Sequence, residues 1–246
     1  MPEESNRLDL AKWAQVESEW TLAETAVANL ARVILHGPPG VGKTHLASRV
    51  GPALSITLCE DLSVQEIGGH YLPNGTQWSF HYGPVSTAFK EGLPLLIHEM
   101  GRASGAVHDF MLAVLDCPDV ARLTLPSGET ILPGAGFKVI ATSNSSPETL
   151  DPALRSRFQA EVHLRTPHPE LVRRFELLYP RLGRAFADSF KDPERAIDPR
   201  RLLSFVELLQ KQVALRRAAA LTFVDSAPDV LAAFSAAGVR FPCDRS

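Results

Sequence analysis

Short apolar runs that end in glycine or polar residues recur along the first two thirds of the chain. They predict buried strands at residues 31–35, 93–97, 137–142 and 160–164, with a shorter β-rich piece at 53–58. Helical patterns lie before and between these runs, at about residues 8–30, 44–50, 84–90, 106–115 and 147–157. This alternation predicts a parallel sheet covered by helices, which is an α/β fold.

Two segments have the composition of hairpins. Residues 68–83 are rich in glycine and aromatic residues and contain Asn74-Gly75, so a hairpin or an inserted loop is expected there. Residues 123–132 predict a second hairpin that turns at Ser127-Gly128.

The pattern changes after Pro167, where arginine-rich helical repeats cover about residues 168–189, 199–215 and 217–237. Residues 165–246 hold 14 Lys and Arg against 10 Asp and Glu, whereas residues 1–164 hold 11 against 18. This asymmetry indicates parts with different roles. We expect an N-terminal helical segment (1–30), an αβα core (31–165) with a β-rich insert (68–90) and a hairpin (121–134), and a small helical lid domain (166–246).

The segment after the first strand fits the pattern G-x-x-x-x-G-K-[ST]. Glycines there allow main-chain N–H groups to approach phosphate oxygens, Lys43 supplies a positive charge, and Thr44 offers a hydroxyl to Mg²⁺. An apolar strand before the pattern and a helix after it favour a nucleotide phosphate site in a three-layer αβα P-loop NTPase. The expected nucleotide-binding residues are Gly37, Pro38, Pro39, Gly40, Val41, Gly42, Lys43, Thr44 and His45.

Composition and spacing argue against several other classes of protein. The 246 residues carry a net charge of -3 and are 45% hydrophobic, so the chain can bury a sizeable core. No apolar run approaches the roughly 20 residues of a membrane span, and the N-terminus does not resemble a secretory signal, so the cytoplasm is the expected location. Neither cysteine nor histidine spacing supports a zinc site. The residues concerned are Cys59, Cys117, Cys243, His36, His45, His70, His81, His108, His163 and His168.

Four motifs in their order along the chain resemble those of AAA+ ATPases. They are the phosphate loop and the segments LPLLIHEMGRAS, FKVIATSN and ALRSRF. More narrowly, QEIGGHY, FHYGPVSTAFKEG and LTLPSGETILPGAGFKVIATSN are similar to the helix-2-insert group, which includes MoxR-type ATPases, dynein-related domains and CbbQ/NorQ activases. The resemblance is strong over about residues 31–165 and weak over 166–215.

The resemblance implies roles for two residues at predicted strand ends. Glu99 would be the carboxylate that polarises the attacking water, and Asn144 the first sensor, which holds that water or the γ-phosphate. An exposed strand-end acid and a turn asparagine are the ordinary alternatives.

The resemblance also implies that arginines act on the phosphates. Arg155 and Arg157 are similar to fingers that a neighbouring subunit supplies, which would imply a ring, and we favour Arg157. A surface ion pair is the alternative. Arg200 or Arg201, at a predicted helix start, is similar to the second sensor, and a capped, solvated helix start explains these residues equally well.

His98 departs from the family pattern. The resemblance places an aspartate before the catalytic glutamate, where it helps to hold Mg²⁺, whereas this chain has His98. Imidazole is a poor ligand for a hard ion that prefers oxygen. Either Thr44, phosphates and waters carry the metal, or hydrolysis is slow or absent. A histidine that merely hydrogen-bonds within the site is a further interpretation.

Three functional hypotheses follow. The first is an ATPase that works as a ring, expected to be a hexamer, and remodels or activates a protein partner through a separate adaptor. The second is a nucleotide-binding scaffold or regulatory subunit with little turnover. A DNA-directed motor is the weakest, because the sequence shows no basic stripe or nucleic-acid motif.

Overall fold

The computed structural model describes residues 18–192 and 195–241, which form two compact units. One unit contains the described residues up to His36 together with Leu46–His163. The other contains Gly37–His45 and the described residues from Leu164 onward. The first part of the helix predicted at about residues 8–30 lies outside the described residues. The three-domain division stays a prediction.

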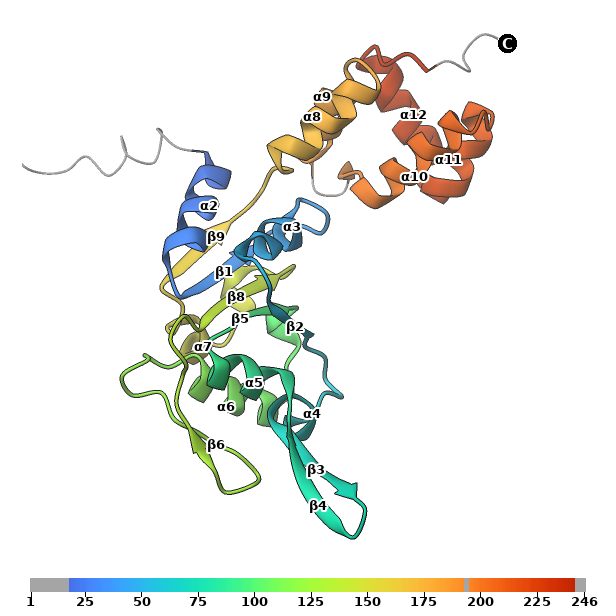
Figure 1. Ribbon diagram of the computed structural model, residues 1–246. Helices are drawn as coiled ribbons and strands as arrows, with labels where there is room; N and C mark the ends of the chain where they lie inside the picture. The colour runs from blue at the N-terminus through green and yellow to red at the C-terminus, as the bar shows by residue number, and fades with distance from the viewer. Residues whose placement is uncertain (1–17, 193–194, 242–246) are drawn as a thin grey trace, which may run out of the picture. The chain divides into compact units, whose positions relative to one another are not determined.

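A five-stranded parallel sheet forms the centre of the first unit (Figure 1). Its strand order is β2-β5-β8-β1-β9, and every neighbouring pair is parallel. All five residues of β1 are buried, as expected of a strand that is covered on both faces. The strands are β1 (Arg32–His36), β2 (Leu54–Thr57), β5 (Pro94–His98), β8 (Lys138–Ser143) and β9 (Ala160–His163). The α/β fold predicted from the apolar runs is confirmed.

The register of three strands determines which residues leave the sheet at the same edge. His36 at the end of β1 pairs with Ser143 at the end of β8, and Ile97 of β5 pairs with Ala141 of β8. Because all three strands run the same way, the residues that follow each of them emerge at one carboxyl edge.

The sheet is flanked by helices. The core of this unit joins Ile34, Ile97 and Val139 of the sheet to Phe89 and Met111 of two helices. The helical elements of this unit are α2 (Glu19–Asn29), η1 (Ser48–Val50), α4 (Val64–Gly68), α5 (Pro84–Glu91), η2 (Met100–Arg102), α6 (Gly105–Val114), η3 (Pro147–Thr149) and α7 (Pro152–Arg155). Helix α3 (Lys43–Ala47) begins in the second unit and ends in the first.

The continuous helix predicted at residues 147–157 is wrong. The structure has η3 and the separate, short α7 instead. Asp151 accepts hydrogen bonds from the backbone N–H groups of Ala153 and Leu154, and Pro152 occupies the first turn. An aspartate cap followed by proline starts a new helix, so this pair interrupts the preceding turn.

Both predicted hairpins are present in the first unit. Strands β3 (Gly69–Asn74) and β4 (Gln77–Tyr82) form one, and β6 (Leu123–Thr124) and β7 (Thr130–Ile131) form the other. A hydrogen-bonded group ties the first hairpin to the second. Tyr82 donates to Glu129, and the Lys90 Nζ donates to the hydroxyl of Tyr82 (2.6 Å) and to Glu129 (2.9 Å).

Helices build the C-terminal part of the second unit around a core rich in phenylalanine, including Phe175, Phe186, Phe205 and Phe234. They are α8 (Pro169–Leu178), α9 (Leu182–Ser189), α10 (Pro199–Gln210), α11 (Leu215–Phe223), η5 (Val224–Ser226) and α12 (Ala227–Ala236). The prediction of a helical C-terminal region is confirmed.

The predicted helix ends in this region are wrong, because two of the three predicted helices are interrupted and the third ends five residues early, at Gln210. Tyr179 precedes Pro180 and adopts an extended conformation, as the proline ring requires, so α8 ends there. Val224 has a φ of 51°, and Pro228 lies in the first turn of α12.

A carboxylate from α8 caps the start of α9. Glu176 accepts hydrogen bonds from the backbone N–H groups of Arg181 (2.8 Å) and Arg184 (3.3 Å). These backbone bonds hold the pKa of Glu176 below its ordinary value. The cap therefore joins two helices and favours the charged form of the carboxyl group.

We predict that Glu176→Gln lowers the free energy of unfolding at pH 7 by about 1 kcal/mol, because the remaining amide oxygen accepts these bonds without a negative charge. The pKa is depressed in the folded state, so the contribution is present above the unfolded-state pKa. It is lost as the pH falls through the folded-state value. Urea unfolding of wild type and variant should therefore differ at pH 7 and converge well below about pH 4.3.

Glu207→Gln, which removes a surface pair with Lys211, is the control and should have a smaller effect. Equal stability of Glu176→Gln and wild type at pH 7 would contradict the cap.

Candidate functional site

Two side chains proposed to be catalytic meet at the carboxyl edge of the sheet. Glu99 directly follows β5, and Asn144 directly follows β8. The Asn144 Nδ2 donates to the Glu99 Oε1 over 2.5 Å. Because β5 and β8 are hydrogen-bonded neighbours, their register brings together two residues that lie 45 positions apart in the chain.

The backbone of Glu99 is in an unusual conformation. Its φ of 58° and ψ of 49° place a non-glycine residue in the left-handed region. Such a conformation costs on the order of 1 kcal/mol and is found most often at functional sites. The turn aims the carboxylate at Asn144 immediately after the strand ends.

His98 is the last residue of β5 and directly precedes Glu99. Its Nδ1 is 3.2 Å from the hydroxyl of Thr142 on β8, and the side chain is half-buried. Burial lowers the pKa of His98, although the nearby charge of Glu99 opposes that shift. The ring is therefore neutral at pH 7. A neutral imidazole does not repel a metal ion, but it supplies no oxygen ligand.

The phosphate loop, Gly37–His45, belongs to the second unit. Gly40 and Gly42 have φ angles of 82° and 117°, which side chains rarely adopt. A Cβ added to Gly40 would lie 2.3 Å from the Cδ of Pro199, the first residue of α10. The Nζ of Lys43 donates to the carbonyl oxygens of Gly37 (2.7 Å) and Pro38 (2.8 Å). The loop thus has the turn that only glycine permits, with a lysine ammonium held against it.

The start of α8 contacts the loop within the same unit. The backbone N–H of His168 donates to the carbonyl of Val41 over 2.7 Å. The ring of His45 lies edge-on to that of His168, with centroids 5.7 Å apart, and its Nε2 is 3.5 Å from a carboxylate oxygen of Glu170. His168 and Glu170 were not predicted as site residues. The sequence indicates a helix start there but not which segment it contacts.

The two candidate finger arginines have different partners. The Nε and a terminal nitrogen of Arg155 bind the two carboxylate oxygens of Glu161 at 2.5 and 2.9 Å. Arg157 donates to the carbonyl of Ala153 (2.8 Å), and its Nε is 3.8 Å from a carboxylate oxygen of Asp116. The guanidinium of Arg155 is therefore held by a bidentate ion pair, whereas that of Arg157 has a longer contact to its carboxylate.

The candidate second-sensor arginines stand at the first turn of α10. The carboxylate of Asp198 accepts from the backbone N–H of Arg200 over 2.8 Å and caps this helix. Arg201 lines a cavity of about 630 Å³ among the helices, together with Phe223 and Asp229. Pro199, which adjoins Gly40, places the helix start beside the loop.

The residues present fit a nucleotide better than they fit a dedicated metal site. A glycine turn, a lysine and the exposed Thr44 suit phosphate oxygens and an associated Mg²⁺. Within residues 18–192 and 195–241, no group of three or more His, Cys, Asp or Glu side chains is arranged to hold a metal ion.

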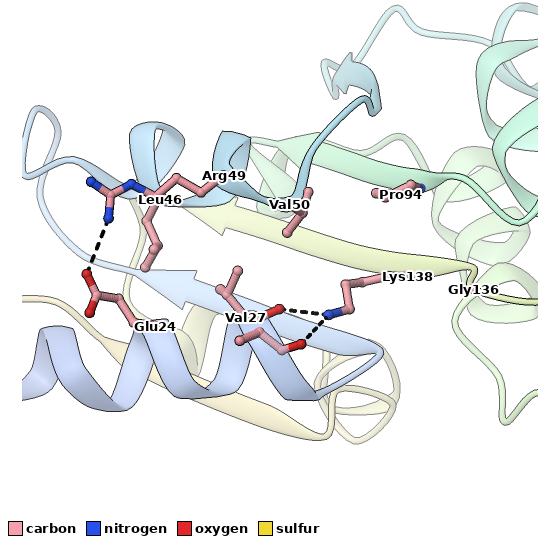
Figure 2. A pocket seen from close by; sticks show the side chains of 9 residues that line it. Glu24, Val27, Leu46, Arg49, Val50, Pro94, Gly136 and Lys138 are labelled. Carbon is pink, nitrogen blue, oxygen red and sulfur yellow. Dashed lines mark hydrogen bonds and ion pairs between the residues drawn. The ribbon is translucent and has the colours of Figure 1, made fainter.

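A cavity of about 520 Å³ lies elsewhere in the first unit (Figure 2). Pro94 and Lys138, the first residues of β5 and β8, line it, so it is at the amino ends of the strands. Lys138 donates to the carbonyl of Val27 (2.8 Å), and Arg49 is 3.5 Å from Glu24. Ligands of parallel sheets bind at the carboxyl ends, so this cavity is distinct from the candidate site.

Comparison with known proteins identifies relatives of this chain. A sequence model of the AAA domain (dynein-related subfamily) matches residues 32–158. The chain is 33% identical to the protein NorQ of Paracoccus denitrificans, with 65% of this chain and 61% of that protein covered. The chain thus spans less than two thirds of that relative's length.

Two solved structures resemble the fold at low sequence identity. NtrX of Brucella abortus in complex with ADP is 18% identical, with a TM-score of 0.54, and the match covers 85% of this chain and 51% of that one. The closed state of Hsp104 with ATPγS and casein is 17% identical, with a TM-score of 0.55, and the match covers 83% of this chain and 50% of that one.

In the described part of the chain, no helix combines the length and apolar character needed to cross a membrane.

We predict that Gly40→Ala lowers the free energy of unfolding by about 1 to 3 kcal/mol, because the new methyl group meets Pro199. Gly51→Ala is the matched control. Gly51 also has a positive φ, 96°, but apart from its chain neighbours no atom of residues 18–192 and 195–241 lies within 4 Å of the added Cβ. It should show only the smaller effect of backbone strain. Denaturant unfolding of both variants measures the difference, and equal destabilisation would contradict the close packing of Gly40.

Proposed function

Because this chain belongs to the dynein-related subfamily of AAA domain proteins, we propose that it binds and hydrolyses ATP to remodel or activate a protein partner. The observation that carries the proposal is the contact between Asn144 and Glu99, which joins an amide donor to a carboxylate at the edge of the sheet. The phosphate loop begins at Gly37, directly after β1, and β1 ends at the same carboxyl edge of the sheet.

ATP binding is assigned to the loop from Gly37 to His45. Its main-chain N–H groups would surround the β- and γ-phosphates, and the ammonium of Lys43 would exchange its contacts with Gly37 and Pro38 for phosphate oxygens. A related fold has been solved with bound ADP, which is consistent with this assignment.

Hydrolysis is assigned to Glu99 and Asn144. Glu99 would accept a proton as a water molecule attacks the γ-phosphorus, a new P–O bond forms, and the bond to the bridging oxygen breaks to release ADP. Asn144 would orient the water or the γ-phosphate through its amide. Thr44 would hold Mg²⁺, which neutralises phosphate charge when bound.

The alternative is a nucleotide-binding scaffold or regulatory subunit with weak turnover. His98 favours it, because a neutral ring bonded to Thr142 supplies no oxygen to a metal. We place the ATPase first, because the loop retains its glycines and lysine and Glu99 already contacts Asn144.

Oligomerisation is part of the proposal. We assign Arg157 as the arginine finger that this chain supplies to the phosphates bound by a neighbouring subunit. Arg155 is less suited to that role, because its guanidinium is held by the bidentate contact with Glu161. A hexameric ring in the cytoplasm that reaches its protein target through a separate adaptor is the arrangement proposed, with no membrane and no nucleic acid as partner. Arg200 is the preferred second sensor, since Arg201 lines the cavity among the helices.

We predict that Lys43→Ala abolishes ATP binding, because the loop loses its positive charge. Isothermal titration calorimetry should give a binding signal for wild type and none for the variant at the same ATP concentration. Lys211→Ala, which removes an exposed lysine paired with Glu207, is the control and should bind as wild type does. Unchanged affinity in Lys43→Ala would refute the assignment of the loop.

We predict that Glu99→Gln slows phosphate release by about 10²-fold or more, the usual effect of removing a general base. ATP affinity should be retained, because the loop is intact. Glu91→Gln, at the exposed end of α5, should release phosphate at the wild-type rate. Equal rates for wild type and Glu99→Gln would place the chain in the scaffold class.

A further inference from the structure

His36 is a buried histidine to which the sequence pattern assigns no role. It is the last residue of β1, its exposed fraction is 0%, and it pairs in register with Ser143 on β8 and His163 on β9. The residue after it, Gly37, begins the phosphate loop. His36 thus stands where the loop joins the sheet.

Its hydrogen bond determines which ring nitrogen carries the proton. The Nδ1 of His36 is 3.3 Å from the carbonyl oxygen of Ser145. A carbonyl only accepts hydrogen bonds, so Nδ1 donates, and the proton of the neutral ring is on this nitrogen. The Nε2 is then an acceptor, and it is buried without a hydrogen-bond partner in the part of the chain that the structure describes.

The electrostatic surroundings keep this ring neutral. Burial is the largest cause and lowers the pKa of His36, and the positive charge of Arg155 acts weakly in the same direction. The carbonyl of Ser145 and the carboxylate of Glu161 oppose the shift without reversing it. Protonation would place an N–H group on the buried Nε2 with no acceptor, which is unfavourable.

The carbonyl that His36 binds belongs to the residue after Asn144. The backbone N–H of Ser145 donates to the hydroxyl of Ser143 (3.1 Å), so the turn at Asn144 is closed on one side by Ser143. On the other side, the imidazole of His36 holds the Ser145 carbonyl. Asn144 therefore projects its amide to Glu99 from a backbone that is fixed before and after it.

We propose that His36 is a positioning residue, which holds the main chain after β8 so that the amide of Asn144 stays against the carboxylate of Glu99. The inference rests on the proposed function in so far as the Asn144 and Glu99 pair serves hydrolysis. His36 acts only through the Ser145 carbonyl and touches no reacting atom in this account.

The Nε2 of His36, which has no hydrogen-bond partner in the described part of the chain, allows the positioning role to be distinguished from simple packing. A buried acceptor without a partner lowers stability, and a phenylalanine ring would remove that unfavourable group. If His36 served packing alone, His36→Phe would therefore be at least as stable as wild type and would turn over ATP at least as fast. The positioning role predicts the opposite effect on turnover.

The experiment compares three variants of the full chain. His36→Phe removes the donor, and His36→Asn restores one, because the Asn side-chain nitrogen occupies the place of Nδ1. His163→Phe is the control, since His163 is the exposed partner of His36 on β9. Steady-state kcat, KM for ATP and the thermal unfolding midpoint are measured, and the side-chain amide signal of Asn144 is followed by ¹⁵N NMR and assigned with Asn144→Ala.

We expect His36→Phe to lower kcat about tenfold or more through misplacement of Asn144. Its KM should stay within about twofold and its unfolding midpoint should not fall, because the loop and the packing are kept. His36→Asn should recover most of kcat, and His163→Phe should match wild type. The Asn144 amide signal should move in His36→Phe and return toward its wild-type position in His36→Asn.

Wild-type kcat in His36→Phe, or an unmoved Asn144 signal, would overturn the inference and leave the ATPase proposal intact. A wild type that turns over no ATP would refute the proposed hydrolysis. The NMR comparison would then still decide whether His36 positions Asn144.

Discussion

The parallel pairing of β8 with both β1 and β5 is the constraint on which the candidate site depends. Parallel strands present their carboxyl ends at one edge, so three short apolar strands deliver the residues after His36, His98 and Ser143 to that edge. A shift of one residue in the β5–β8 register would turn the alternate side chains to the other face of the sheet. The contact between Glu99 and Asn144 would then be lost, whatever the sequence of the loops.

Near that edge, the positions of the site residues involve local arrangements that are unfavourable in free energy. Glu99 adopts a left-handed backbone conformation, and a buried nitrogen of His36 has no hydrogen-bond partner among the described residues. Each cost is on the order of 1 kcal/mol or somewhat more. The buried cores of the two units, with their phenylalanines and branched aliphatic side chains, offset such costs.

Much of this arrangement could be predicted from the sequence, because apolar runs and glycine turns are local signals. The strands and the helical C-terminal region follow from periodicity, and both hairpins follow from glycine turns. Helix ends were predicted less well, since Asp151 with Pro152, and Pro180, interrupt patterns that are apolar enough to continue. The Glu176 cap and the bond from His36 to Ser145 could not be predicted, because each depends on a partner that only the folded chain brings close. His98 was found as a departure from a family pattern, but its contact with Thr142 needed the register of β5 and β8.

We propose that this edge and the loop that follows β1 hydrolyse ATP, although His98 stands where the resemblance to AAA+ ATPases implies an aspartate. Phosphate release by the wild-type chain, measured at saturating ATP across a titration of Mg²⁺, tests it most directly. We expect phosphate release well above the rate of uncatalysed hydrolysis, saturable in ATP and dependent on Mg²⁺. ATP that binds to the chain and is not hydrolysed at any Mg²⁺ concentration would contradict it.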